Sequence, residues 1–171
     1  FHQYNVSAYD GVNPAIYGTL NVTLINTEPV WEPTAVFNWT NYHSIPLEFV
    51  TNASDPEGDT LTYSLVNLTA DLNTPLTINS STGHVPESGA YSPVINDTGL
   101  HQYNVSVTDG LNAIYGLLNV TILNRAPEWE PTAVFNWTNY TNIDMEFVTN
   151  ASDVDGDTIF YNITNMTADL N

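Results

Sequence analysis

Two acidic turns carry the side chains of this sequence that could do chemistry. Asp55-Pro-Glu-Gly-Asp59 places carboxylates on alternate positions around a glycine, and Asp153-Val-Asp-Gly-Asp157 repeats the arrangement. Alternate carboxylates on a tight turn suit a hard cation such as Ca²⁺, which takes about six to eight oxygen ligands. A solvated acidic turn without a bound ion has the same pattern, and no glutamate closes an EF-hand loop at the expected distance. The candidate calcium ligands are Asp55, Glu57, Asp59, Asp153, Asp155 and Asp157.

The two turns belong to an internal repeat. Residues 31–42 and 129–140 are the same twelve residues, and the spacing of 98 positions is the size of one small β domain. The chain is therefore expected to be a window of a longer array or a processed subunit. The predicted domains are the last two strands of a preceding repeat in 1–28, a complete repeat in 29–125, and the first strands of a following repeat in 126–171.

The complete repeat has the periodicity of β-strands. Residues 102–108 alternate, with Tyr103, Val105 and Val107 on one side, and no segment shows a helical period with caps. The strands are predicted at 34–39, 46–53, 59–65, 75–78, 84–87, 90–95, 102–108 and 113–123. Of these eight ranges, 84–87 and 90–95 have the weaker pattern around Gly89, and about seven short strands separated by turn residues are typical of an immunoglobulin-like sandwich. We therefore predict an all-β chain of tandem seven-stranded immunoglobulin-like or cadherin-like β-sandwiches.

Asparagine sequons are far more frequent than composition explains. With 22 Asn and 32 Ser or Thr among 171 residues, chance would give about four Asn-x-Ser/Thr sites. On their strands Asn104 and Asn119 fall between core positions, so glycans there would point away from the core. A dense N-glycan coat is predicted, with an unglycosylated, Asn-rich exposed surface as the alternative. The fourteen sequons begin at Asn5, Asn21, Asn38, Asn52, Asn67, Asn79, Asn96, Asn104, Asn119, Asn136, Asn139, Asn150, Asn162 and Asn165.

The strongly acidic composition excludes some classes of binding partner. Arg125 is the only basic residue, the net charge is −18, and there is no cysteine. Nothing in such a chain could neutralise nucleic-acid phosphates, and anionic membrane surfaces are disfavoured for the same reason. No apolar run is long enough to span a bilayer. The aromatic content of 12% indicates a packed core rather than a disordered acidic tail. An extracellular or cell-surface location is expected.

The histidines are poor catalytic candidates. His2 and His101 occupy the same repeat position, and His43 is replaced by Thr141 in the next copy. No nucleophile elbow, zinc-binding helix or phosphate loop is present. Paired carboxylates cleave glycosides in other proteins, but calcium explains these short spacings more simply. We predict no catalytic residues and no enzymatic activity.

The joints between repeats are proline-rich. Residues 26–33 and 124–131 each contain two prolines within five positions and no glycine, so each joint should be short and stiff. Trp31 and Trp129 sit in these stretches. They are predicted either to lie in the core of the first strand or to pack between successive repeats.

Four stretches resemble cadherin-like repeats of the dystroglycan type and related prokaryotic cell-surface and fibre proteins: residues 53–65, 77–85, 103–110 and 120–127. The resemblance implies a seven-stranded sandwich used in adhesion, surface layers or fibres. It also implies calcium near a domain junction, bound by the first two acids of each turn and by Asp109, with Asp10 as its counterpart in the earlier copy. The acidic linker motif of true cadherins is absent, with only Asn26 and Asn124 remaining, and the acidic motif before the sixth strand is not evident.

Two functions are consistent with these features. The first is a structural repeat of a heavily N-glycosylated filament, stalk or surface layer, whose partners are further copies joined head to tail. Near-identical repeats and stiff joints favour this function. The alternative is an adhesin or the carbohydrate-binding accessory module of a secreted protein, which predicts an exposed aromatic platform.

Overall fold

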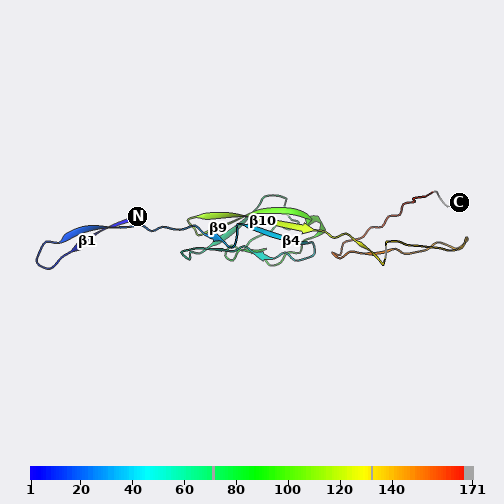
Figure 1. The fold of residues 1–171 in the computed structure, drawn as a ribbon, viewed down its shortest axis with the longest axis horizontal. Helices are drawn as coiled ribbons and strands as arrows, with labels where there is room; N and C mark the ends of the chain where they lie inside the picture. Colours follow the sequence, from blue (N-terminus) through cyan, green and yellow to red (C-terminus); the bar gives the residue numbers. More distant parts are fainter. Residues whose placement is uncertain (71, 132, 168–171) are drawn as a thin grey trace.

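The computed structural model describes residues 1–70, 72–131 and 133–167. Residues 168–171, which belong to the predicted third unit, lie outside this range. A β-hairpin, a central sandwich and an open unit follow one another along the long axis of the molecule (Figure 1). None of the described residues forms a helix that could cross a membrane.

The central unit is built on one four-stranded sheet. Its strands, in spatial order, are β4 (Val36–Tyr42), β10 (Ala113–Leu123), β9 (Gly99–Thr108) and β7 (Thr62–Asn67). β4 runs parallel to β10, whereas the other two pairings are antiparallel. Along β9 every second residue from His101 to Val107 is buried, as the alternation predicted. The predicted bounds of β10 are confirmed.

The opposite layer consists of short ladders. β3 (Val30–Trp31) pairs with β6 (Ala53–Ser54), β5 (Phe49–Val50) pairs with β8 (His84–Val85), and Leu47 bridges Tyr91. The predicted strand 46–53 therefore exists, but it changes partner along its length. The all-β prediction is confirmed, while the interrupted ladders leave the count of seven strands a prediction.

Two predicted strands are wrong. Residues 75–78 form no ladder, although Leu76 is buried and Ile78 packs against the core. In place of a strand at 90–95, a single bridge at Tyr91 leads into a 3₁₀ turn, η1 (Ile95–Asp97). The carboxylate of Asp97 accepts the Val94 N–H at 2.8 Å. This local hydrogen bond competes with strand pairing, as short acidic side chains commonly do.

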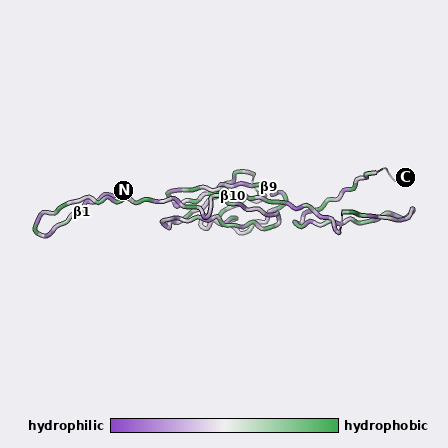
Figure 2. The backbone as a smooth tube through the Cα atoms, in the orientation of Figure 1, coloured by the Kyte–Doolittle hydropathy of each residue, from purple (hydrophilic) through white to green (hydrophobic). Residues whose placement is uncertain are grey.

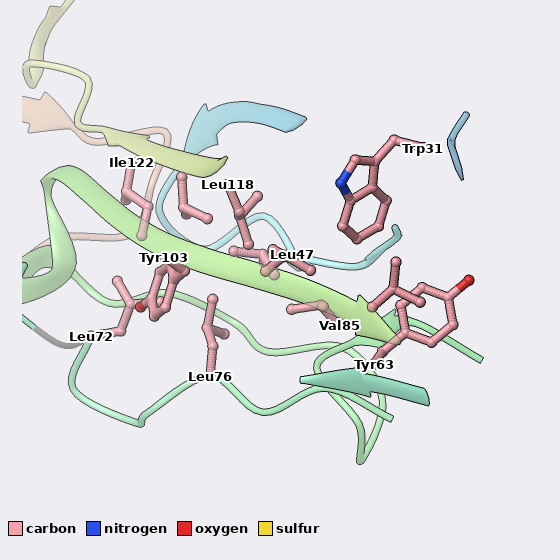
Figure 3. Close-up of a cluster of buried hydrophobic side chains, with 12 residues drawn as sticks. Trp31, Leu47, Tyr63, Leu72, Leu76, Val85, Tyr103, Leu118 and Ile122 are labelled. Carbon is pink, nitrogen blue, oxygen red and sulfur yellow. The ribbon is translucent and has the colours of Figure 1, made fainter. Parts of the chain in front are cut away.

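The core fills the space between the two layers (Figure 3). Trp31 and Tyr63 lie at one end of the labelled cluster, and Tyr103, Leu72 and Ile122 lie toward the other. The Trp31 ring contacts Phe37 edge-on, with 5.1 Å between ring centroids, and it is 8% exposed. Of the two predictions for this tryptophan, the structure therefore supports the core position.

The flanking units repeat parts of the central one. β1 (His2–Ala8) and β2 (Ile16–Val22) form a hairpin with the register of β9–β10. β11 (Glu128–Glu130) pairs with β12 (Asn150–Ser152), as β3 pairs with β6. Short hydrophobic and hydrophilic stretches alternate along the chain in all three units (Figure 2). None of the six longer strands β1, β2, β4, β7, β9 and β10 contains Asp, Glu, Lys or Arg.

Candidate functional site: the joints between repeats

Each acidic turn is organised by its first carboxylate. Asp55 Oδ1 accepts the N–H groups of Glu57 at 2.9 Å and Asp59 at 3.1 Å, and Gly58 takes a φ of 80°. Asp153 makes the same pair of hydrogen bonds, at 2.8 and 3.2 Å, in the next repeat. The positive φ explains the glycine, because residues with a Cβ rarely adopt it. The first acid of each turn therefore has a structural role in forming the turn.

At the first joint, two linker residues contact two acids of the central repeat. Thr27 donates to Glu57 from its hydroxyl at 2.7 Å and from its N–H at 3.2 Å. The Asn26 amide donates to Asp109 Oδ2 at 2.8 Å. Hydrogen bonds from the Asn112 and Leu111 N–H groups and from Asn26 outweigh desolvation and lower the pKa of Asp109. Both predicted ligands thus lie at the junction.

Asp10 closes the hairpin turn in the same way as Asp109. It accepts the N–H groups of Asn13 and Val12, and the Asn13 side chain donates to it at 2.7 Å. These hydrogen bonds, the Asn13 N–H first, lower the pKa of Asp10 to about 2. This position is therefore a turn-forming carboxylate in both copies.

The second joint has different chemistry. The Arg125 N–H donates to Asp155 Oδ2 at 2.9 Å, and the Arg125 guanidinium lies 3.0 Å from Asp155 Oδ1. The imidazole Nε2 of His43 lies 3.0 Å from Asp157 Oδ2 and 2.6 Å from Asn124 Oδ1. The guanidinium also stacks 4.1 Å from the Tyr42 ring centroid. Two carboxylates of the third unit are thus bracketed by side chains of the central repeat and its linker.

These contacts bear on the calcium prediction. Among the described residues, no group of three or more His, Asp or Glu side chains is placed to hold a metal ion. One carboxylate oxygen of each turn, Asp55 Oδ2 at the first joint and Asp155 Oδ1 at the second, is buried without a hydrogen-bond partner, which is the kind of oxygen a cation would use. At the second joint this oxygen already faces the Arg125 guanidinium, whereas no such cation of the described residues faces Asp55, and calcium binding at either turn stays a prediction.

Asp97 is a key polar residue that sequence reasoning missed. It is 1% exposed and accepts hydrogen bonds from the Tyr91 hydroxyl at 2.5 Å and the Asn73 N–H at 2.5 Å, besides Val94. Burial alone would raise the pKa of Asp97, but these hydrogen bonds and nearby His101 lower it. Burial and the Asp97 carboxylate raise the pKa of Tyr91 to about 12. The only sequence signal was an acid inside a sequon, which is too common to single out.

Three histidines make structural contacts. The ring nitrogens of His101 lie 2.8 Å from the Ala70 and Asp97 carbonyl oxygens. His84 contacts the Pro86 carbonyl at 2.8 Å and Glu48 at 2.9 Å, and these two hydrogen bonds raise the pKa of His84. His43 contributes to the second joint, a role that its replacement by Thr141 in the next copy concealed.

None of the fourteen sequon asparagines is buried. On the outer face of the four-stranded sheet, Gln102 donates to Asn119 and Asn119 donates to Asn38, both at 2.9 Å. Gln3 and Asn21 repeat the first of these contacts in the hairpin, at 3.0 Å. Asn67 lies on the inward side of β7 but at its last position, where it caps a turn by accepting the Thr69 N–H. The geometry is compatible with modification at all fourteen positions.

We predict that most of these sites carry glycans in native material, because accessible Asn-x-Ser/Thr sites are the substrate of N-glycosylation. Intact-mass measurement should give a mass well above the 18.9 kDa of the bare segment. Enzymatic removal of the glycans should return the mass to that value, with aspartate at each released site. Glycan on fewer than a quarter of the sites would contradict the prediction.

Comparisons with known proteins give fold-level similarity. No protein-family model matches the chain, and no curated protein matches it. Among solved structures, it is similar to human protocadherin-24 EC1-2, with 20% identity over 76% of this chain and a TM-score of 0.48. This chain spans 61% of the length of that EC1-2 chain.

Two further similarities are of the same order. Drosophila N-cadherin EC1-4 is 14% identical over 61% of this chain and 27% of its own, with a TM-score of 0.47. An endo-fucoidan hydrolase of glycoside hydrolase family 107 is 18% identical over 72% of this chain and 19% of its own, with a TM-score of 0.44. At such identities and TM-scores, no activity or partner of these proteins transfers to this chain.

Proposed function

We propose that this chain is a structural repeat segment of a heavily N-glycosylated extracellular filament, stalk or surface layer, in which successive sandwiches join head to tail. The observation that carries the proposal is a match between two uncovered surfaces. One is the inner face of the hairpin β1–β2, and the other is an open aromatic slot in the third unit, which the structure describes over residues 126–131 and 133–167.

The aromatic slot is already arranged as in a finished core. The Trp129 ring centroid lies 5.0 Å from that of Phe135 and 6.0 Å from that of Tyr161. The equivalent pairs around Trp31 are separated by 5.1 and 6.4 Å. Trp31 is 8% exposed, whereas Trp129 is 44% exposed. An open hollow of about 570 Å³ is lined by Trp129, Ala133, Phe135, Phe147, Thr149, Tyr161, Asn162 and Ile163.

The hairpin presents the complementary face. Tyr4 pairs with Leu20, as Tyr103 pairs with Leu118 in the central repeat. Tyr4 is 52% exposed, but its counterpart Tyr103 is 1% exposed. Val6 and its counterpart Val105 differ in the same way, at 47% and 0%. The hairpin therefore exposes the apolar face that the same sequence buries when it lies in a sandwich.

The central repeat provides the template for joining them. There β9 and β10 lie between β4 and β7, and residues 134–140 and 160–165 are the counterparts of those two flanking strands. A hairpin with the sequence of β1–β2 fits between them, supplied either by the continuing polypeptide or by another copy through strand addition. Where another copy supplies the hairpin, the contact joins unlike surfaces, and a contact of this kind propagates into a filament rather than closing.

The exposed aromatic residues favour this function over the adhesin or carbohydrate-binding alternative. Sugar-binding surfaces commonly present several exposed rings. Among the described residues of the central repeat at 29–125, Tyr115 is the only exposed aromatic side chain. The proposal accordingly assigns the chain a non-catalytic, structural role outside the cell, with further copies of itself and covalent glycans as its partners.

Electron microscopy of native material and of the purified 171-residue chain tests the proposal. We expect unbranched filaments one sandwich thick, with density for glycans on their outer surface in the native sample. Closed rings would contradict it. So would a compact monomer in which the hairpin and the open unit both pack on the central repeat.

A further inference from the structure

We propose that the second joint, residues 124–131, is held by a cation that the protein itself supplies, the guanidinium of Arg125, and does not depend on calcium. The two joints of this chain are then not equivalent. This inference concerns how one repeat is fixed on the next, and it holds whether or not chains assemble into filaments.

The position of the only basic residue is the first argument. In a chain with 19 acidic residues and a single arginine, that arginine lies in the linker opposite an acidic turn. Its backbone and its side chain engage different oxygens of Asp155, at 2.9 and 3.0 Å. Its guanidinium also stacks on Tyr42 of the preceding repeat, and cation–π stacking of this kind favours arginine. One side chain thus connects both repeats.

The burial of the partners is the second argument. The Asp155 side chain is fully buried and that of His43 is 4% exposed. Buried charges are screened much less by salt than exposed ones, and a buried carboxylate requires a partner. His43 Nε2 faces two acceptors, Asn124 Oδ1 and Asp157 Oδ2, so it serves as the hydrogen-bond donor beside the ion pair. A metal ion would have to displace the guanidinium to reach Asp155.

The first joint shows what changes when the arginine is missing. The backbone contact is the same, since the Thr27 N–H donates to Glu57 as the Arg125 N–H donates to Asp155. Thr27 contributes only a neutral hydroxyl at 2.7 Å. The contacts of Glu57 and Asp109 with the linker therefore come from neutral groups, and no positively charged side chain takes part in them. The shared backbone contact sets the register of both joints, and Arg125 adds the charge neutralisation at one of them.

The test uses the full 171-residue chain with spin labels on two introduced cysteines. The sequence has no cysteine of its own, so labels can be placed at the exposed positions Glu87 and Thr158, one on each side of the second joint, and diluted with unlabelled chain. Distance distributions are measured by pulsed electron paramagnetic resonance, once with excess calcium and once with excess EDTA. The variant Arg125→Thr copies the residue of the first joint. Glu128→Gln, an exposed charge in the same linker, is the matched control.

We expect one narrow distribution for the wild type, unchanged by EDTA. Arg125→Thr should widen it by about twofold or more, because it removes the positive charge beside the buried Asp155 and leaves only the backbone N–H contact, while Glu128→Gln should leave it narrow. Three results would overturn the inference: a wild-type distribution that widens in EDTA, one that is broad in both conditions, or an Arg125→Thr variant as narrow as the wild type. Thermal melts of the central repeat confirm that each variant is folded.

Discussion

In the purified 171-residue segment, substituting aspartate for Val6 is expected to abolish strand addition between copies while leaving the central repeat as stable as in the wild type. In the free chain this side chain is exposed, so a carboxylate there is hydrated and harmless. In a joined chain it would take the place that Val105 holds in the core, where exposure is 0%. Burying an unpaired carboxylate costs several kcal/mol or more. Sedimentation and electron microscopy of the purified variant measure the loss of filaments.

Thr19→Asp is the matched control for this experiment. Thr19 belongs to the same hairpin but pairs with Asn5 on its outer face, and it is part of no sequon. The control adds the same charge to the same element and should assemble normally. Filaments of Val6→Asp as abundant as those of the wild type would show that the hairpin does not enter the slot.

Replacing Asp97 by alanine should destabilise the central repeat by about 3–5 kcal/mol. The change leaves the Tyr91 hydroxyl and the Asn73 and Val94 N–H groups without their acceptor, and each unsatisfied buried donor costs about 1–3 kcal/mol. Since a domain is stable by only about 5–15 kcal/mol, this is a large fraction of the total. Urea unfolding at neutral pH measures it. Glu87→Ala, an exposed acid, should change stability by less than about 0.5 kcal/mol.

The effect of Asp97 should also depend on pH in a defined direction. Its pKa is lowered in the folded protein, so the unfolded chain binds the proton more readily. The stabilisation is fully present above the unfolded pKa of about 3.9 and is lost as the pH falls through the folded pKa. The difference in unfolding free energy between wild type and Asp97→Asn should therefore shrink on acidification. A difference that grows at low pH would contradict the lowered pKa.

The sequence predicted the parts of the fold that depend on local alternation. β10 was placed at its observed bounds because its inward residues Leu118, Val120 and Ile122 recur at every second position. The strand predicted at 75–78 is wrong because buried apolar side chains can hold a segment against the core even where no neighbouring strand pairs with it. Alternation reports which side faces the core, but it does not report whether a neighbouring backbone is available.

The candidate site divides in a similar way. The acidic turns and their glycines could be predicted from the internal repeat, because each turn consists of five consecutive residues. The second joint could not be predicted, because it unites His43, Arg125 and Asp155 from segments that only the folded chain brings together. The lone arginine of an acidic chain was the available signal. Its partner could be assigned only once the third unit was in place.

The absence of charged residues from the six longer strands has a consequence for how the four-stranded sheet avoids aggregation. The four-stranded sheet ends in two bare edges, β4 and β7, and natural sheets usually guard such edges with charged residues or proline. These edges have neither, but each carries a sequon asparagine, Asn38 on β4 and Asn67 on β7. If those sites are glycosylated, the bulky sugars block edge-to-edge pairing with other sheets, as charged side chains such as lysine do in other proteins. Resistance to aggregation would then depend on glycosylation of these two sequons. The same chain expressed in a host without N-glycosylation would aggregate more readily.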